Sequence, residues 1–254
     1  MRRTVSRECV EAVLSKGLEA GGAMRRSLLT WYWDCSGGCL APVTIELIGR
    51  EPKWRATHRG RTPPRIFLDM DVPCRKCEPC RKRRATTWAA KAHTEIESSY
   101  RTWFVTLTMN HQTRATTRAR AQQIAHEDAL EFEALSDVDQ FRLWVKAAYP
   151  HFQRYLKRLR KEAGPLRYLF VAEAHKDGSP HFHVLVHEPD PSENVKEKML
   201  RSHWRNNGLG YAEAKLADTF SAWYCTKYLT KDVHDKVRAS FKYGEIEPKF
   251  DLTS

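Results

Sequence analysis

Hydrophobic and polar positions alternate with two different periods in the second half of the chain. Residues 102–110, "TWFVTLTMN", form a β-branched and aromatic run that predicts a buried strand. Residues 139–161, "DQFRLWVKAAYPHFQRYLKRLRK", repeat apolar side chains at helical spacing, with a stripe made by Phe152, Tyr155, Leu156 and Leu159. This stripe predicts a helix that buries one face in a core and turns its arginines and lysines outward.

The same kind of patterning predicts the remaining elements of this half. We expect a hairpin of strands at residues 166–175 and 181–188 around the turn "KDGS", a helix within 192–210 that ends at Gly208, a short strand at 211–218 and a final helix at 219–233. Residues 111–139 are polar and predict a loop with a partly helical insertion. This order predicts an α+β fold, with an antiparallel sheet and helices on one side, in a ferredoxin-like or RRM-like arrangement.

The first third of the chain has a different character. Residues 1–30 read as a helical N-terminal extension, and Met24 is an alternative start. Residues 31–85 carry most cysteines among short strands, and a helix is expected from Arg81 onward. We therefore predict a Cys-rich zinc-binding element at 31–85, a main domain at 86–240 and a C-terminal tail at 241–254.

Composition points toward a polyanionic partner. The 254 residues carry a formal net charge of +12, with 43 Lys and Arg against 31 Asp and Glu, and basic chains commonly bind nucleic acid. No run of about twenty apolar residues exists, so no membrane span is expected. No apolar stretch follows the basic N-terminus, so no secretory signal is expected. Candidate phosphate contacts are Arg81, Lys82, Arg83, Arg84 and Lys227; the alternative for the first four is a solvated basic helix face.

Five of the seven cysteines are clustered. Cys35 and Cys39 are followed by "PCRKCEPCRKRR", and paired thiolate turns of this kind typically hold a structural zinc ion in a reducing compartment. We expect the ligands to be Cys39, Cys74, Cys77 and Cys80, with Cys35 as the substitute. The alternative is reduced cysteines that pack as small apolar residues.

The stretch "KDGSPHFHVLVHE" is a second candidate metal site. Residues two apart in a strand share a face, so the imidazoles of His181 and His183 project together. The hairpin brings the carboxylate of Glu173 across to them. Two imidazoles and a carboxylate suit a hard-to-borderline divalent ion that acts as a Lewis acid. The alternative is a solvated strand face, and His187 on the same face is expected to be solvated, to support the metal ligands or to face DNA.

The final helix offers a nucleophile. Tyr224, Tyr228 and Lys231 are spaced to share one helical face. A phenolate beside a metal ion and an ammonium group is a suitable nucleophile for phosphorus. The alternative is that both tyrosines are aromatic residues of the core.

The order "FVTLT", "SPHFHVLV" and Tyr-x-x-x-Tyr resembles the three motifs of HUH endonucleases, which initiate rolling-circle replication. Over residues 70–235 the chain is similar to replication-associated proteins of small single-stranded DNA phages of the gokushovirus and filamentous-phage type. The resemblance implies Mg²⁺ or Mn²⁺ held by His181, His183 and Glu173, catalysis by Tyr224, Tyr228 or both, and a role for Lys231.

This resemblance implies a nickase and ligase that cuts single-stranded DNA at a replication origin through a covalent 5′-phosphotyrosine. No G-x-x-x-x-G-K-[ST] loop is present, so we expect a host helicase and a host polymerase as partners, in the cytoplasm of a bacterial host. The alternatives are a transposase or plasmid initiator with the same chemistry, or a non-catalytic, zinc-containing module that binds single-stranded nucleic acid.

Overall fold

The chain is described here by a computed structural model that covers residues 30–34, 36–50, 65–175, 177–192, 195–230 and 237–245. It divides into two compact units. The smaller unit holds strands β1 (Thr30–Asp34), β2 (Val43–Arg50) and β3 (Arg65–Val72), in which β3 is central, parallel to β1 and antiparallel to β2. The expected N-terminal extension, residues 1–30, lies outside the described residues except for its last position.

The larger unit contains Gly38–Leu40 and the chain from Cys74 onward. Its strands are β4 (Arg101–Met109), β5 (Arg167–Ala174), β6 (Pro180–Glu188), β7 (Gly210–Leu216) and β8 (Arg238–Ala239). They form one antiparallel sheet in the order β7-β4-β6-β5-β8, so the predicted α+β class with an antiparallel sheet is confirmed.

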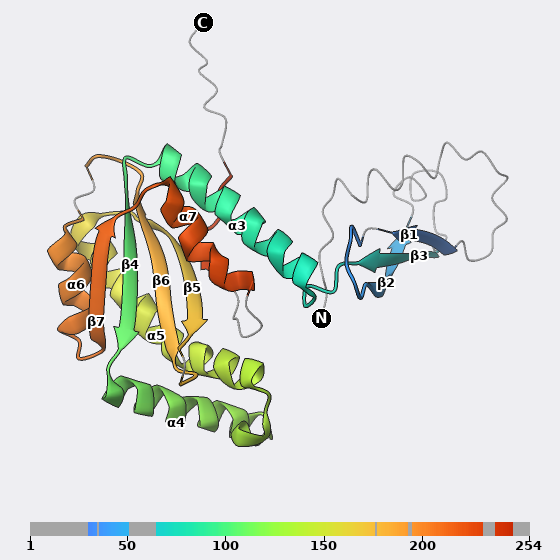
Figure 1. Ribbon diagram of the computed structural model, residues 1–254, viewed down its shortest axis with the longest axis horizontal. Helices are drawn as coiled ribbons and strands as arrows, with labels where there is room; N and C mark the ends of the chain where they lie inside the picture. Colours follow the sequence, from blue (N-terminus) through green and yellow to red (C-terminus); the bar gives the residue numbers. More distant parts are fainter. Residues whose placement is uncertain are drawn as a thin grey trace, which may run out of the picture. The chain divides into compact units, whose positions relative to one another are not determined.

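The helices of this unit cover both faces of the sheet (Figure 1). They are α3 (Glu78–Ser98), α4 (His111–Glu127), α5 (Asp137–Ala163), α6 (Glu197–Arg205) and α7 (Thr219–Thr226), with short 3-10 turns η1 (Phe132–Ala134) and η2 (Lys227–Thr230). The expectation of helices on one side only is wrong. Helices α5 and α6 bury one face, and α3 and α7 bury the other, because β4, β5 and β6 carry buried apolar residues on both faces.

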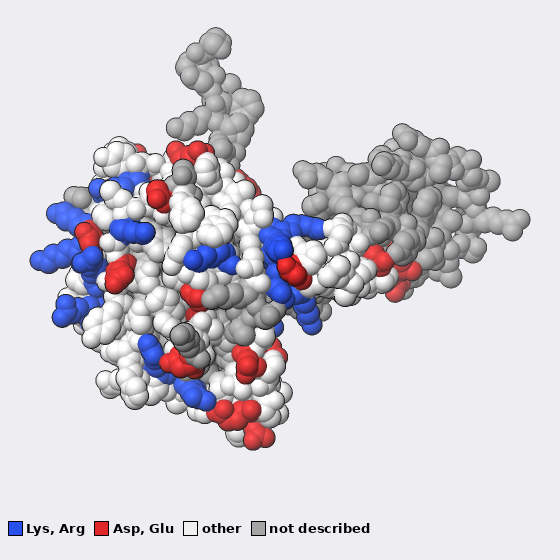
Figure 2. All heavy atoms as spheres, viewed as in Figure 1, with Lys and Arg blue, Asp and Glu red and all other residues white. Residues whose placement is uncertain are grey.

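Helix α3 begins directly after the cysteine-rich segment and runs across the expected domain boundary at residues 85 and 86. Its first half is rich in arginine and lysine, and Figure 2 shows these charges gathered over that half. The buried residues Ala85, Ala92 and Glu95 face the sheet. The helix therefore presents an apolar stripe inward and a basic face outward.

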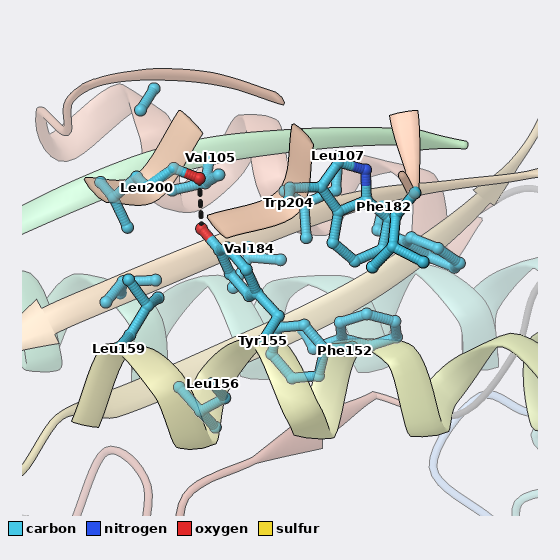
Figure 3. Packing of buried hydrophobic residues seen from close by; sticks show 14 of the residues in the cluster. Val105, Leu107, Phe152, Tyr155, Leu156, Leu159, Phe182, Val184, Leu200 and Trp204 are labelled. Atoms are coloured by element: carbon cyan, nitrogen blue, oxygen red, sulfur yellow. Dashed lines mark hydrogen bonds between the residues drawn. The ribbon is translucent and has the colours of Figure 1, made fainter. Parts of the chain in front are cut away.

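The main core lies between the sheet and helices α5 and α6 (Figure 3). The predicted stripe of Phe152, Tyr155, Leu156 and Leu159 is buried there against Phe182, Val184, Leu200 and Trp204. The buried Tyr155 hydroxyl donates to the carbonyl of Leu200 at 3.0 Å, which satisfies its polar end. Burial raises the pKa of Tyr155 well above its usual value.

Residues 111–127 form the regular helix α4, so the prediction of a mainly irregular loop there is wrong. Its inward face consists largely of small residues, among them Thr117, Ala121 and Ala125, which pack near Trp144. The side chain of Asn110 caps the first turn by accepting from the backbone N–H of Thr113 at 2.8 Å. A face of threonine and alanine carries little hydrophobic periodicity, which explains why the pattern indicated a loop.

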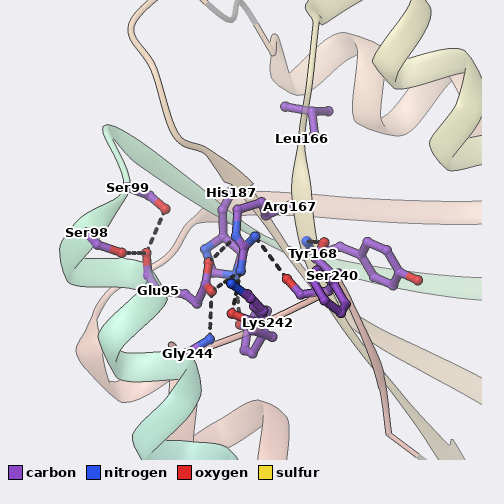
Figure 4. Close-up of polar contacts among 12 residues, drawn as sticks. Glu95, Ser98, Ser99, Leu166, Arg167, Tyr168, His187, Ser240, Lys242 and Gly244 are labelled. Carbon is purple, nitrogen blue, oxygen red and sulfur yellow. Dashed lines mark hydrogen bonds and ion pairs between the residues drawn. The ribbon is translucent and has the colours of Figure 1, made fainter. Parts of the chain in front are cut away.

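The segment after the final helix returns to the sheet. Strand β8 pairs with β5, and the backbone N–H of Gly244 donates to Glu95, which is also paired with Arg167 (Figure 4). Residues 241–245 of the expected C-terminal tail thus pack on the larger unit. Within the described residues, no helix combines the length and apolarity needed to cross a bilayer.

Candidate active site

The histidine motif lies on β6, the central strand of the sheet. Phe182, Val184 and Val186 point to the α5 side and are fully buried, so alternation turns His181 and His183 to the α3 and α7 side. In the register of the hairpin, Glu173 on β5 lies directly opposite His181. Packing of the apolar face therefore fixes the direction of both imidazoles.

The carboxylate and the two imidazoles are joined in pairs. Nε2 of His183 lies 3.0 Å from Oε2 of Glu173, and the two side chains are only 5% and 17% exposed. Nδ1 of His181 lies 3.1 Å from the hydroxyl of Thr108 and 3.0 Å from Nε2 of His175. The rings of His181 and His183 are 4.9 Å apart between centroids.

Two of these neighbours were not identified from the sequence. His175 lies just past the end of β5, two residues after Glu173, so strand alternation places it on the same face. That spacing was a usable signal in "EAH". Thr108 reaches His181 through the pairing of β4 with β6, which the sequence pattern alone does not specify.

The environment of the histidines favours neutral rings. Burial, aided by the charges of His183 and His175, lowers the pKa of His181 to about 4. Nδ1 of His183 is buried and has no hydrogen-bond partner among the described residues. A buried polar atom without a partner costs about 1–3 kcal/mol and is frequent at functional sites. Neutral imidazoles beside a carboxylate are the form in which histidine binds a metal ion.

Both predicted tyrosines lie against His183. The ring of Tyr228 stacks on the imidazole with centroids 4.7 Å apart and planes 8° apart, and Tyr224 meets it edge-on at 6.0 Å. The two phenol rings are 5.8 Å apart. Burial first, and then a hydrogen bond with Tyr224 and the charge of Glu173, raises the pKa of Tyr228 well above its ordinary value. The tyrosine hydroxyls are thus neighbours of the histidine and carboxylate pair.

The two tyrosines do not share one regular α-helix, as the spacing had predicted. Helix α7 ends at Thr226, and Tyr228 belongs to the 3-10 turn η2. Such tightening is common where the last carbonyls of a helix lack partners. Tyr224 is half-buried while Tyr228 is only 8% exposed, so the two phenols differ in their access to solvent.

Lys227 lies between the tyrosines. Its Nζ is 3.6 Å from the ring centroid of Tyr224 and 4.9 Å from that of Tyr228. An ammonium group over an aromatic face is a cation–π contact. The other predicted lysine of this site, Lys231, lies outside the described residues.

The four predicted zinc ligands come together in the larger unit. The sulfurs of Cys39, Cys74, Cys77 and Cys80 all lie within 4.8 Å of one another. The backbone N–H groups of Cys77 and Lys76 donate to the Cys74 sulfur at 3.3 and 3.4 Å. The fifth candidate, Cys35, lies outside the described residues.

The cysteine cluster is chemically suited to a metal ion. A hydrogen bond from the backbone of Leu40 is the main cause that lowers the pKa of Cys77 to about 6, and backbone donors also lower that of Cys74. Thiolates are the form that binds zinc. Within the described part of the chain, these sulfurs are the donor atoms that already converge on one point, whereas those of Glu173, His181 and His183 are joined pairwise.

The predicted basic contacts have different environments. Arg81 donates from Nε to the carbonyl of Thr230 at 3.0 Å and from Nη1 to the carbonyl of Lys76 at 2.8 Å, so it ties α3 to η2. Lys82 is exposed and lies 2.7 Å from Glu78. Arg83 is exposed and Arg84 is half-buried. Their contact with phosphate stays a prediction.

Comparison with known proteins agrees with this geometry. Residues 102–233, slightly more than half of the chain, match the family described as replication-associated protein ORF2. The chain is 26% identical over 172 residues to the replication-associated protein VP4 of Bdellovibrio phage phiMH2K, which covers 63% of this chain and 48% of that protein. The chain thus spans about half the length of this curated relative, and no solved structure matches. On the strength of the family match, the chain belongs to the ORF2 family of replication-associated proteins.

Proposed function

We propose that the protein is a site-specific endonuclease and ligase for single-stranded DNA, which initiates rolling-circle replication of a phage genome. The observation that carries this proposal is the contact of both tyrosine rings with His183, whose Nε2 lies 3.0 Å from Glu173. A nucleophile beside a candidate metal centre is the arrangement that phosphodiester transfer requires.

His181, His183 and Glu173 would hold Mg²⁺ or Mn²⁺. Their donor set fits such an ion, and the unpartnered Nδ1 of buried His183 is a further sign of a site built for a ligand. When bound, the ion would polarise the scissile phosphate and offset the charge that develops on it. His175 and Thr108 would orient the ring of His181 through their contacts with its Nδ1.

In the first step, the phenol oxygen of Tyr224 attacks phosphorus. The bond between phosphorus and the 3′ oxygen breaks, and the phenol proton ends on the released 3′-OH. The product is a 5′-phosphotyrosine, which keeps the energy of the phosphodiester, so no nucleotide cofactor is needed. Lys227, with Nζ 3.6 Å from the Tyr224 ring centroid, supplies positive charge beside this oxygen, and Lys231 is proposed to do the same.

After one round of synthesis, Tyr228 attacks the regenerated origin and forms a second phosphotyrosine. The newly freed 3′-OH then attacks the first phosphotyrosine, which returns the proton to Tyr224 and closes the displaced circle. The 5.8 Å separation of the rings supports the use of both phenols at one phosphate site. A host polymerase extends the first 3′-OH and a host helicase unwinds the duplex in the bacterial cytoplasm.

We also propose a structural zinc ion at Cys39, Cys74, Cys77 and Cys80, supported by the convergence of their sulfurs. Metal–thiolate binding contributes directly to folding free energy. Cys74→Ser or Cys77→Ser should therefore give insoluble or zinc-free protein. Purified native protein that contains no zinc by elemental analysis, with freely reactive thiols, would count against the site.

The function is tested by mixing the protein with a single-stranded origin oligonucleotide and Mg²⁺ or Mn²⁺. We expect a covalent adduct that survives denaturing electrophoresis, depends on the metal ion and disappears in the Tyr224→Phe/Tyr228→Phe variant. The matched control is Tyr100→Phe, since Tyr100 is an exposed tyrosine outside the site. An adduct in the double variant would place the nucleophile elsewhere, and tight binding with no adduct would indicate a non-catalytic binding module.

A further inference from the structure

A groove lies between helix α3 and the end of α7, beside the tyrosines. It encloses about 340 Å³. From α3 it is lined by Lys82, Ala85, Thr86 and Ala89, and from α7 and η2 by Trp223, Thr226, Lys227 and Thr230. Small ligands generally occupy pockets of roughly 300–1,000 Å³, so this groove suits one nucleotide or a few atoms more.

The groove exists because the facing residues of α3 are small. Positions 82, 85, 86 and 89 share one face of the helix, and three of them are alanine or threonine. Opposite them, Trp223 is 54% exposed, although its neighbours Ala222 and Cys225 are buried. An exposed tryptophan beside an open groove has its ring face available for a ligand.

The aromatic surface extends beyond Trp223. The ring of Phe220 is 62% exposed, and its centroid lies 5.4 Å from that of Trp223. Two exposed neighbouring rings on one short helix form a small stacking platform. Folding itself does not require either ring to be exposed, because the buried side of α7 is formed by other residues.

Lys227 connects this platform with the tyrosines. Its Nζ is 5.9 Å from the ring centroid of Trp223 and 3.6 Å from that of Tyr224. A phosphate at the tyrosines and a base on Trp223 would therefore share one cation. Lys82 adds a second ammonium group at the α3 rim, on the basic half of that helix (Figure 2).

We propose that this groove binds an unpaired base of single-stranded DNA next to the cleaved phosphate, with the base stacked on Trp223 and the backbone beside Lys227 and Lys82. The proposal rests on the proposed function and adds to it the place where the strand enters. Aromatic faces with interleaved cations are typical of single-strand binding, because a stacked base must be unpaired.

The test measures equilibrium binding of a labelled origin oligonucleotide to the Tyr224→Phe/Tyr228→Phe variant in chelator, where no covalent step interferes. Adding Trp223→Ala should weaken binding by about 5- to 100-fold, the usual loss for one stacked base. Trp223→Phe should stay within about threefold, because it keeps an aromatic face. Ala89→Trp keeps Trp223 but fills the groove, and should weaken binding as Trp223→Ala does.

The matched control is Tyr100→Ala, which removes a 60% exposed ring away from the groove and should leave affinity unchanged. Unchanged affinity in both Trp223→Ala and Ala89→Trp overturns the assignment, even where the wild-type protein forms the covalent adduct. Loss of binding in both supports it, even where no adduct forms. Tighter binding of RNA of the same sequence would make RNA the occupant and would also overturn the proposal.

Discussion

Two polar clusters share one face of the sheet, and they differ in how fully their groups are paired. Around His187, Nδ1 meets the hydroxyl of Thr102 and Nε2 meets that of Tyr243, both at 2.8 Å. Beside it, Glu95 pairs with Arg167 and accepts from Gly244 (Figure 4). Around His183, Nε2 meets Glu173 but Nδ1 has no partner in the described residues.

The contrast separates structure from function among the same residue types. Both clusters combine histidine, tyrosine and glutamate on adjacent strands and nearby helices. A fully paired buried network rigidifies the fold, whereas a buried group left without a partner is costly and needs another reason to persist. We therefore assign the His187 cluster to stability and the His183 cluster to chemistry.

The largest expected effect concerns the unpaired cluster. His181→Ala should reduce the yield of covalent DNA adduct by more than about a thousandfold, since the proposed metal ion supplies several kcal/mol of stabilisation to the transition state. The free energy of unfolding should change by less than about 1 kcal/mol, because His181 is half-buried and its strand packs through Phe182 and Val184. Adduct assays and urea unfolding measure the two quantities. Wild-type nicking after chelation and return of Mg²⁺ would refute the assignment.

The paired cluster should respond in the opposite way. His187→Ala leaves the hydroxyls of Thr102 and Tyr243 without a partner and opens a cavity at a fully buried position. The free energy of unfolding should fall by about 2–4 kcal/mol. Adduct formation by the folded protein should stay within about threefold. If this variant instead lost activity at unchanged stability, the distinction between the two clusters would be wrong.

A third way to sharpen the comparison is pH. Burial lowers the pKa of His187 from 6.5 to about 4, with Glu95 and Arg167 as opposing nearby charges. The unfolded chain therefore takes up a proton below pH 6.5 that the folded chain refuses until about pH 4. The stability that depends on neutral His187 is present above pH 6.5 and is lost as pH falls toward 4, by roughly 3 kcal/mol.

Urea unfolding of the wild type and of His187→Ala at several pH values measures this contribution. The difference between the two proteins should shrink as pH falls from 6.5 to 4, because the variant lacks the group that titrates. A difference that is constant over this range would mean that His187 is already protonated in the folded state.

Much of this organisation followed from the sequence, for local reasons. Alternation in "HFHVLV" placed His181 and His183 on one face, and the hairpin brought Glu173 to them. The spacing of Tyr224 and Tyr228 brought both rings to His183 even though the helix tightens between them. Periods of two and 3.6 residues are local, so they are readable without knowledge of the fold.

What the sequence did not predict depends on distant pairings. His187 was expected to be solvated, to support the metal ligands or to face DNA, but it is fully buried because residues 238–245 return to cover it. Arg167 meets Glu95 from 72 positions away, and α4 was hidden because its buried face is made of threonine and alanine. Small buried residues and long-range ion pairs leave little trace in hydrophobic periodicity.

The smallest expected effect compares two hydroxyls, one in each cluster. Tyr243→Phe leaves Nε2 of buried His187 without its partner at 2.8 Å, which should cost about 1–2 kcal/mol of unfolding free energy. Tyr228→Phe keeps the ring stacked on His183 at 4.7 Å and should change stability by less than about 0.5 kcal/mol. It should leave the first adduct on Tyr224 and impair the release of closed circles. Mass spectrometry of the tryptic peptide would locate the nucleotide, and an adduct on Tyr228 in the wild type that is lost in Tyr228→Phe would reverse the proposed order of the two tyrosines.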